Sequence, residues 1–356
     1  MGHGGILTAT GVGTGLEQLI KAQAYGVGFD LVGITTLGPA DTTNAFDEWI
    51  ARGYAGDMAY LPRGAEKRRD TRLPFPAARS AIVVGLNYGG TSTSGPVARY
   101  ARGDDYHEVM WRMLDTLHAW IDDHIGLATA ARSYVDTGPI LERDLARRAG
   151  LGWFGKNTNL INPDIGSFFF IGSLLIDLEL EPDTPFEADR CGTCVRCIDA
   201  CPTGAILEPR VLDATKCISY LTIEAKGAIP LELREEIGDR LYGCDICQDV
   251  CPWNVSFARD AAHEAFAPRP GMLESARDVS RRMLAMSVEE FRSTLKGSPI
   301  KRAKLRGLRR NAAVVLGNVG DGDDLPALQS TLDDPDDLVR EHASWAFGRI
   351  DSRTSR

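Results

Sequence analysis

The chain lacks two features that would place it in a membrane or outside the cell. No uninterrupted apolar stretch reaches the roughly 18 residues that a membrane-spanning helix needs. The first residues, MGHGGILTATGVGTGLEQ, lack the charged start and the following apolar run of an export signal. We therefore expect a cytoplasmic protein that makes no contact with a membrane.

Cysteine is scarce, with eight residues in a chain of 356. A chain of this length buries a sizeable core without disulfides, and a reducing compartment disfavours them. All eight nevertheless lie between residues 191 and 251. Cysteines clustered in such a setting are more often metal ligands than disulfide partners.

The spacing of these cysteines is typical of iron–sulfur proteins. In the bacterial ferredoxin run, three cysteines hold one cluster and the fourth, before a proline, holds another. CGTCVRCIDACP at residues 191–202 has this pattern, and CISY with CDICQDVCP repeats it with one cysteine displaced upstream. The predicted ligands of the first 4Fe–4S cluster are Cys191, Cys194, Cys197 and Cys251, and those of the second are Cys201, Cys217, Cys244 and Cys247. Zinc or scattered structural thiols, the alternative, do not predict two Cys-Pro endings at matched offsets.

The chain also lacks an excess of basic residues, since its formal net charge is -9. With 44% hydrophobic and 25% charged residues, it has the composition of an ordinary globular protein of two or three domains. One segment, SPIKRAKLRGLRRN at residues 298–311, is nevertheless basic and contains no acid. Its charged residues are Lys301, Arg302, Lys304, Arg306, Arg309 and Arg310. They either contact phosphates or form a solvated helix face.

Helical and strand patterns alternate through the first 180 residues. Helical spacing predicts helices at residues 15–28, 45–53, 106–126 and 140–152. Apolar and β-branched runs predict strands at residues 30–35, 80–88 and 131–139, and one strand or a pair at residues 167–180. We expect the apolar stripe of residues 106–126 to belong to the core. This alternation is typical of an α/β domain.

The C-terminal part contains an internal repeat at an offset of 31 residues. LRRNAAVVLGNV at residues 308–319 matches VREHASWAFGRI at residues 339–350, including two small residues of each copy. Helix pairs with such a period are typical of HEAT-like repeats, which form binding surfaces. Two copies are few, so we expect them to pack on the cysteine-rich part. The predicted domains are residues 1–180, 181–260 and 261–356.

Long motifs give the chain a resemblance to a known family. WIARGYAGDMAYL, RYARGDDYHEVM, VDTGPILERDLARRAGLGWFGKNTNLI, CGTCVRCIDACPTGAI and YGCDICQDVCPWN resemble the epoxyqueuosine reductases. These are cobalamin-dependent iron–sulfur enzymes that complete queuosine in tRNA. The resemblance covers roughly residues 15–260 and the HEAT-like tail, and it departs from the family near Ser173, where a glutamate is common. It implies an α/β cobalamin-binding domain, a ferredoxin-like module with two 4Fe–4S clusters, and an all-α HEAT-like region.

The resemblance implies reduction of an epoxide to an alkene by Co(I) cobalamin, with the two clusters supplying electrons. Cobalamin would be held base-off, without a histidine on cobalt, between the α/β domain and the cluster module. Asp136 in VDTGP resembles the proton donor, which would have to be protonated at working pH. From the residues alone, Asp136 could instead cap a turn. His107 could be packed, substrate-facing or catalytic.

Further site residues are implied by the same resemblance. The expected cobalamin contacts are Met58, Tyr60, Tyr100, Asp136, Asn157, Asn159, Ser167, Ser219 and Tyr220. The basic segment from Lys301 to Arg310 would bind tRNA with epoxyqueuosine at the wobble position, the base being turned outward. Lys156 and Arg143 would contact phosphate or remain solvated. We expect a monomer that takes electrons from an unidentified low-potential donor.

Two other functions fit parts of the sequence. A reductive dehalogenase shares the cofactor set, but the basic C-terminal tail and the missing export signal argue against it. A two-cluster electron carrier would leave the first 180 residues and Asp136 without a purpose. Absence of bound corrinoid in protein made with cobalamin present would favour the carrier.

Overall fold

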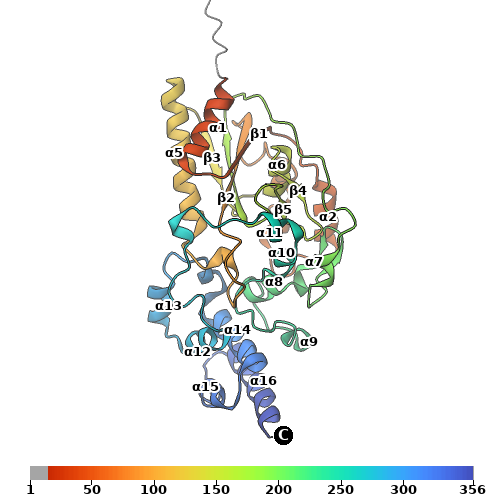
Figure 1. Cartoon of the computed structure of the whole chain (residues 1–356), viewed down its shortest axis with the longest axis vertical. Coiled ribbons are helices and arrows are strands. Elements are labelled where there is room, and N and C mark those ends of the chain that lie inside the picture. The colour runs from red at the N-terminus through yellow and green to blue at the C-terminus, as the bar shows by residue number, and fades with distance from the viewer. Residues whose placement is uncertain (1–14, 356) are drawn as a thin grey trace, which may run out of the picture.

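The computed structural model describes residues 15–355. A sheet with its helices forms one end, the cysteine-rich part lies beside and below it, and the C-terminal helices form the other end (Figure 1). Within residues 15–355, no helix is both long and apolar enough to cross a membrane. The arrangement therefore puts the cysteine-rich part between the sheet and the C-terminal helices.

A four-stranded sheet forms the centre of the N-terminal part. Its strands are β1 (Leu31–Thr36), β2 (Ser80–Asn87), β6 (Phe169–Ile176) and β3 (Ala131–Tyr134), in that spatial order. Every residue of β2 is buried, as its β-branched sequence predicts for a central strand. The expected mixture of helices and strands is confirmed, but all three strand pairs are antiparallel. Ser173 is wholly buried in β6, so the departure from the family pattern falls in the core.

Helices cover both faces of this sheet. On one face, α1 (Leu16–Val27) and α5 (Tyr106–Ile125) pack Ile20, Met110 and Leu114 against alternate residues of β2. On the other face, α6 (Glu142–Arg148) packs Leu145 against the remaining residues of β2. The apolar stripe of α5 is therefore core, as predicted. Short helices α2 (Thr43–Ala51), α3 (Tyr60–Arg63) and α4 (Ala65–Arg69) fill the connection between β1 and β2.

Asp105 determines where α5 begins. Its carboxylate accepts the backbone N–H of His107 at 3.1 Å, which caps the helix. The helix ends at Gly126, whose left-handed backbone (φ 67°) is a common C-terminal cap. Because Asp105 fixes the first turn, Tyr106 and His107 occupy defined positions at the edge of the sheet.

The two cysteine runs fold alike. The helices α7 (Arg196–Asp199) and α10 (Ile246–Asp249) each contain the last CxxC cysteine and end before the Cys-Pro ending, and they contact each other. The helix α8 (Ile218–Ile223) begins directly after Cys217, and α11 (Pro252–Phe257) directly after Cys251. Smaller elements of this part are β4 (Trp153–Phe154), β5 (Leu160–Ile161), β7 (Ile206–Glu208), β8 (Val211–Leu212) and α9 (Leu231–Arg234). The sequence repeat is therefore also a structural repeat.

The C-terminal part is helical and packs on the cysteine-rich part, as expected. Its helices are α12 (Ala276–Ala285), α13 (Val288–Thr294), α14 (Lys304–Val319), α15 (Leu325–Thr331) and α16 (Asp337–Thr354). The repeated segments form much of α14 and α16, which pack together. Gly317 allows their close approach, since a Cβ atom there would lie 2.5 Å from the Trp345 ring. One core joins Leu308 and Val279 to Ile218 and Leu241.

Candidate active site and cluster sites

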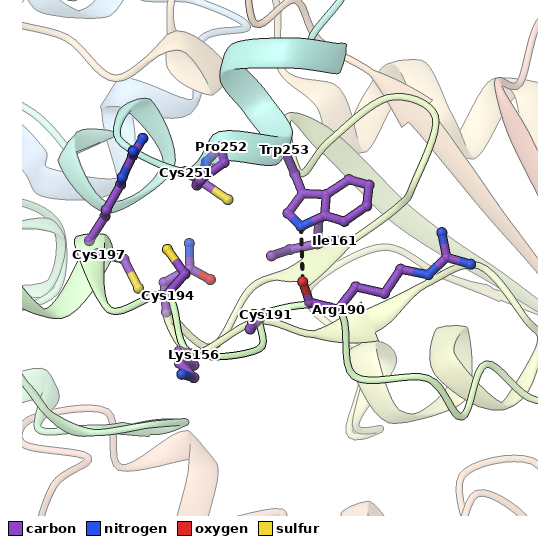
Figure 2. Close-up of a pocket in the computed structure, with 11 residues that line it drawn as sticks. Lys156, Ile161, Arg190, Cys191, Cys194, Cys197, Cys251, Pro252 and Trp253 are labelled. Carbon is purple, nitrogen blue, oxygen red and sulfur yellow. Dashed lines mark hydrogen bonds between the residues drawn. The ribbon is translucent and has the colours of Figure 1, made fainter.

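The first predicted cysteine set lines one cavity. Cys191, Cys194, Cys197 and Cys251 surround a space of about 200 Å³, and Figure 2 shows the sulfur atoms of Cys194, Cys197 and Cys251 facing it. Ile161, Pro252 and Trp253 complete the apolar wall. None of the cysteines is in a disulfide. A thiol-lined space of this kind suits a polyatomic cluster, so the donor set fits the predicted 4Fe–4S group.

The second predicted set also comes together. Cys217 lies close enough to Cys201 for their charges to interact, and Cys244 interacts in the same way with Cys217. Burial raises the pKa of the Cys244 thiol to about 12, and the neighbouring Cys217 adds to the shift. Because thiolates crowded in this way need a positive partner, this donor set fits iron as well.

The two sets are neighbours. Cys247 of the second set lies near enough to feel the charge of Cys197 of the first. The buried Asn157 lies between them, since it lines the first cavity and its amide donates to the Cys247 carbonyl at 3.2 Å. Asn157 was expected to contact cobalamin, but burial assigns it to the packing of the cluster sites.

Ser167 is likewise misassigned by the sequence. It is 5% exposed, and its hydroxyl donates to Gln248 at 2.8 Å and accepts from the Asn254 amide at 2.9 Å. These bonds join the segment before β6 to α10 and α11. Ser167 therefore holds the sheet to the cysteine-rich part, and its hydroxyl is not available to a ligand.

Asp136 lies just beyond the end of β3, in a strained turn. Its backbone is left-handed (φ 57°), which costs a non-glycine residue about 1–3 kcal/mol. Its backbone N–H donates to Glu142 Oε1 at 2.7 Å. Tyr106 Oη donates to Asp136 Oδ2 at 3.0 Å, and His107 Nε2 lies 3.6 Å from the same oxygen. The start of α5 and the start of α6 thus converge on one carboxylate.

The Asp136 carboxylate is open to solvent although protein atoms crowd it. Its side chain is 67% exposed, yet burial by the surrounding protein is the strongest influence on its pKa. The space in front of this carboxylate is called the hollow below. Burial alone would raise the pKa of Asp136, but the nearby charge of His107 and the hydrogen bond from Tyr106 outweigh it, so the pKa is lowered. To act as a proton donor from this state, Asp136 would therefore have to take its proton from a neighbouring group.

The proton is held by neighbouring groups instead. Burial disfavours the His107 imidazolium, but its bond to Asp105 (2.6 Å) and its contact with Asp136 raise the pKa of His107 to about 9. His107 Nε2 is buried without a hydrogen-bond partner among the described residues. Burial and the charge of Asp136 raise the pKa of Glu142 to about 8. Sequence reasoning missed Asp105 and Glu142, although Asp-x-His at a helix start is a recognisable capping pattern.

Several of the expected cobalamin contacts do surround this hollow. Tyr60 and Tyr100 lie near enough to Asp136 to feel its charge. Tyr220 Oη accepts the Asp57 N–H at 2.7 Å and so supports the loop that carries Met58. The remaining residues of this set, Ser219 and Asn159, are half-buried.

The hollow adjoins the second cysteine set. Cys217 caps the start of α8, and Ser219 and Tyr220 lie in its first turn. Asp245, between Cys244 and Cys247, accepts the N–H of Arg99 at 2.8 Å, which fixes the segment leading to Tyr100. The first cysteine set, the second cysteine set and the hollow therefore lie in this spatial order in the molecule.

The basic segment is less available than its sequence suggests. Arg310 is 1% exposed and donates to the carbonyls of Leu221, Ala225 and Gly227. Arg309 is ion-paired with Asp334 at 2.7 Å. The expectation that Arg310 binds tRNA is wrong, because this buried arginine ties α14 to its neighbours.

The rest of the segment lies nearer the surface. Arg302 pairs with Glu224 at 2.8 Å, and Arg306 with Asp336 at 2.7 Å. Lys301 is half-buried over the Phe291 ring, while Lys304 is exposed. Lys156 donates to the Gly192 carbonyl at 2.7 Å, and Arg143 to the Thr158 carbonyl at 2.6 Å. To contact a phosphate, Lys156 and Arg143 would have to break these hydrogen bonds.

Two protein families match parts of the chain. Residues 68–137 match the family described as "Epoxyqueuosine reductase QueG, DUF1730", and residues 190–254 match the "4Fe-4S double cluster binding domain". The first match includes the end of β3 with Asp136, and the second includes all eight cysteines. The chain therefore contains an iron–sulfur cluster domain.

Whole-chain relatives carry one name. Epoxyqueuosine reductases of Pseudomonas aeruginosa and Escherichia coli are each 40% identical over 94% of this chain, which covers 94% and 89% of those proteins. A crystal structure of epoxyqueuosine reductase with a modified tRNA-Tyr stem loop is 32% identical, with a TM-score of 0.87 over 94% of this chain and 90% of that chain. A Bacillus subtilis epoxyqueuosine reductase with its catalytic aspartate loop swung out of the active site is 31% identical, with a TM-score of 0.82 over 94% and 90%.

Proposed function

The chain belongs to the epoxyqueuosine reductase family, and on this premise we propose that it reduces epoxyqueuosine to queuosine at the wobble position of tRNA. One observation of the structure carries the proposal. The two cysteine sets lie in series and end beside a hollow that holds an acid–base group. This order is what a reductase needs to bring electrons and protons to one substrate. An electron carrier without catalysis has no use for the hollow.

The hollow would hold cobalamin base-off. When bound, cobalamin would supply a strongly reducing and nucleophilic cobalt centre. The aromatic side chains of Tyr60, Tyr100 and Tyr220, with Met58, Asn159 and Ser219, suit the apolar face and amide arms of such a macrocycle. His107 is the histidine at Asp136, and its two nitrogens face Asp105 and Asp136. With both nitrogens turned to carboxylates, His107 would take part in proton transfer and would not bind cobalt.

The proton balance follows from the groups around Asp136. Removing the epoxide oxygen breaks two C–O bonds and consumes two electrons and two protons, giving an alkene and water. At neutral pH, His107 carries a proton on Nε2, which faces Asp136 Oδ2. Asp136 would receive that proton and pass it to the oxygen released by ring opening. Glu142, which is also protonated at neutral pH, is the source of the second proton.

The position of Asp136 would depend on Glu142. The relative from Bacillus subtilis has its catalytic aspartate loop swung out, and we infer that the Asp136 loop of this chain can move in the same way. Here the bond from the Asp136 N–H to Glu142 Oε1 stabilises a left-handed turn that would otherwise be costly. Glu142 would therefore hold the loop in the productive position.

The tRNA would approach the open side of the hollow. The exposed Lys304, with Arg302 and Arg306 after release from their surface ion pairs, would contact phosphates. Arg302 also lies over the Tyr60 ring at 5.7 Å, at the side of the hollow. The modified base would be turned out of the anticodon loop to reach it. In this proposal, residues 1–180 bind cobalamin, residues 181–260 hold the clusters and residues 261–356 assist tRNA binding.

A product assay tests the proposal. The holoenzyme, with both clusters and cobalamin, is reduced with dithionite and mixed with a tRNA stem loop carrying epoxyqueuosine, and the nucleosides are then separated. We expect queuosine from the parent and little from Asp136→Asn, which keeps the size of the side chain but cannot relay a proton. If the fully loaded parent leaves the epoxide intact, the proposed function is wrong.

A further inference from the structure

We propose that the surface over the first cysteine set is the docking site for a small acidic protein that carries one electron at a time. The inference deepens the proposed function by naming the partner from which the clusters take electrons. The surface, here called the cluster rim, consists of Lys156, Arg190 and Arg196 with the apolar residues Val195 and Val255. Each docking event would oxidise the partner by one electron and reduce the first cluster by one, so two events serve one epoxide.

The position of the cluster rim suits electron input. The second cysteine set adjoins the hollow through α8, so the first set is the end of the series that lies away from the substrate. The first cavity reaches the surface, because Arg190 and Arg196, which line it, are both exposed. A donor bound at the cluster rim would therefore not compete with tRNA for the hollow.

The charge of the cluster rim is opposite to that of the protein. Of the residues that line the cavity, Lys156, Arg190 and Arg196 are basic and none is acidic, although the net charge of the chain is -9. The nearby Asp189 is paired with Arg210 at 2.7 Å. A basic patch on an acidic protein steers an acidic partner to that patch and keeps it off the rest of the surface.

The Arg190 side chain is directed to solvent and not into the cavity. Figure 2 shows its side chain extending away from the cysteines, past Trp253. Its guanidinium lies 5.3 Å from the centre of the Phe186 ring, and its backbone carbonyl accepts the Trp253 indole N–H at 3.3 Å. Arg196 is exposed and has no ion pair among residues 15–355. Both side chains can therefore meet carboxylates of another protein.

An exposed apolar patch accompanies these charges. Val195 is 41% exposed, and on α11 Val255 is 72% and Phe257 42% exposed. Phe257 stacks on Trp253, which lines the cavity, so the patch is continuous with the wall of the first cysteine set. Short-lived electron-transfer complexes are small, with about 1,200 Å² or less buried in total. A few apolar side chains among basic ones suit such a complex.

The test uses the loaded holoenzyme and a plant-type 2Fe–2S ferredoxin as the acidic probe. Binding of oxidised ferredoxin is measured by titration calorimetry at about 50 mM and about 500 mM salt, since screening weakens exposed charge pairs. Reduction of the clusters by reduced ferredoxin is followed by stopped-flow absorbance, with dithionite as a small reductant that needs no docking. The variants are Arg190→Glu and Arg196→Glu. Arg112→Glu is the matched control, because Arg112 is exposed on α5, on the opposite side of the molecule from α7 in Figure 1.

We expect each variant at the cluster rim to weaken ferredoxin binding and slow ferredoxin-driven reduction by about tenfold at low salt, and much less at high salt. Reduction by dithionite and the affinity for the tRNA stem loop should stay within about twofold of the parent, and the control should match the parent throughout. Absence of salt-sensitive binding by the parent would overturn the proposal.

Two further outcomes would assign the cluster rim to a different role and would overturn the proposal. Equal slowing with dithionite and ferredoxin would mean that the arginines act on the cluster itself. A weakened stem-loop affinity with normal ferredoxin binding would mean that they contact RNA. If ferredoxin docks as expected but dithionite-reduced parent leaves epoxyqueuosine intact, the proposed function fails while the docking site stands.

Discussion

Replacing Glu142 should show how much of the activity depends on the position of the Asp136 turn. Glu142→Met keeps the length of the side chain but removes the acceptor of the Asp136 N–H, which now donates at 2.7 Å. Because this bond lies at an exposed position, its loss costs about 0.5–1.5 kcal/mol, which lowers the population of the productive turn by roughly 2- to 13-fold. The left-handed backbone of Asp136 adds to the tendency to leave this turn. We expect kcat to fall by about that factor and KM for the stem loop to change little.

Glu142→Gln is the matched control, because its amide oxygen can accept the same N–H. Because glutamine keeps the turn but cannot supply the second proton, kcat near pH 7 should fall, but by less than in Glu142→Met. The pKa of Glu142 is raised to about 8, so the parent should lose activity as the pH rises through 8, and Glu142→Gln should lack this step. Iron content and melting temperature show whether each variant is folded. Equal losses in Glu142→Met and Glu142→Gln, or no loss in Glu142→Met, would refute the reasoning.

Three further predictions concern residues whose surroundings are now known. Ser167→Ala should destabilise the protein by about 1–3 kcal/mol in urea unfolding, because buried partners lose a hydrogen bond, without changing cobalamin affinity. Arg310→Met should lower stability by a similar 1–3 kcal/mol and leave stem-loop affinity unchanged, whereas Lys304→Ala should weaken stem-loop binding about threefold at low salt and leave stability unchanged. The raised pKa of His107 means that its contribution to stability is fully present below pH 6.5 and is lost as the pH rises through about 9, so melting temperatures of the parent and His107→Gln should converge at alkaline pH.

The sequence predicted the features that depend on local spacing. Both predicted cysteine sets come together, because Cys191, Cys194 and Cys197 follow a short-range pattern, as do Cys244 and Cys247, and each Cys-Pro ending marks a cysteine that joins the other set. Helices and strands were predicted for the same reason, since their periodicity is read from neighbouring residues. The antiparallel pairing of the sheet could not be read in this way, because it depends on how distant strands meet.

Errors arose where tertiary packing decides the role of a polar side chain. Asn157 and Ser167 lie in motifs of the family, but only the packing of α10 and α11 shows that they are buried. Arg310 belongs to a basic run, yet α14 is enclosed by α12, α16 and the cysteine-rich part, so this arginine faces inward. The sequence did not show that the Asp136 carboxylate is stabilised by His107 and Tyr106, which lie about 30 residues before it in the chain.

The central claim is that electrons pass through the two clusters to the epoxide, and that Asp136 passes a proton to the oxygen released by ring opening. It is tested most directly by mixing pre-reduced holoenzyme with the epoxyqueuosine stem loop, without further reductant, while cluster absorbance is followed and queuosine is quantified in quenched samples. We predict that two electrons leave the protein for each queuosine formed, and that Asp136→Asn keeps its clusters reduced and forms little product. Cluster oxidation without queuosine, or queuosine from Asp136→Asn at the rate of the parent, would contradict the account.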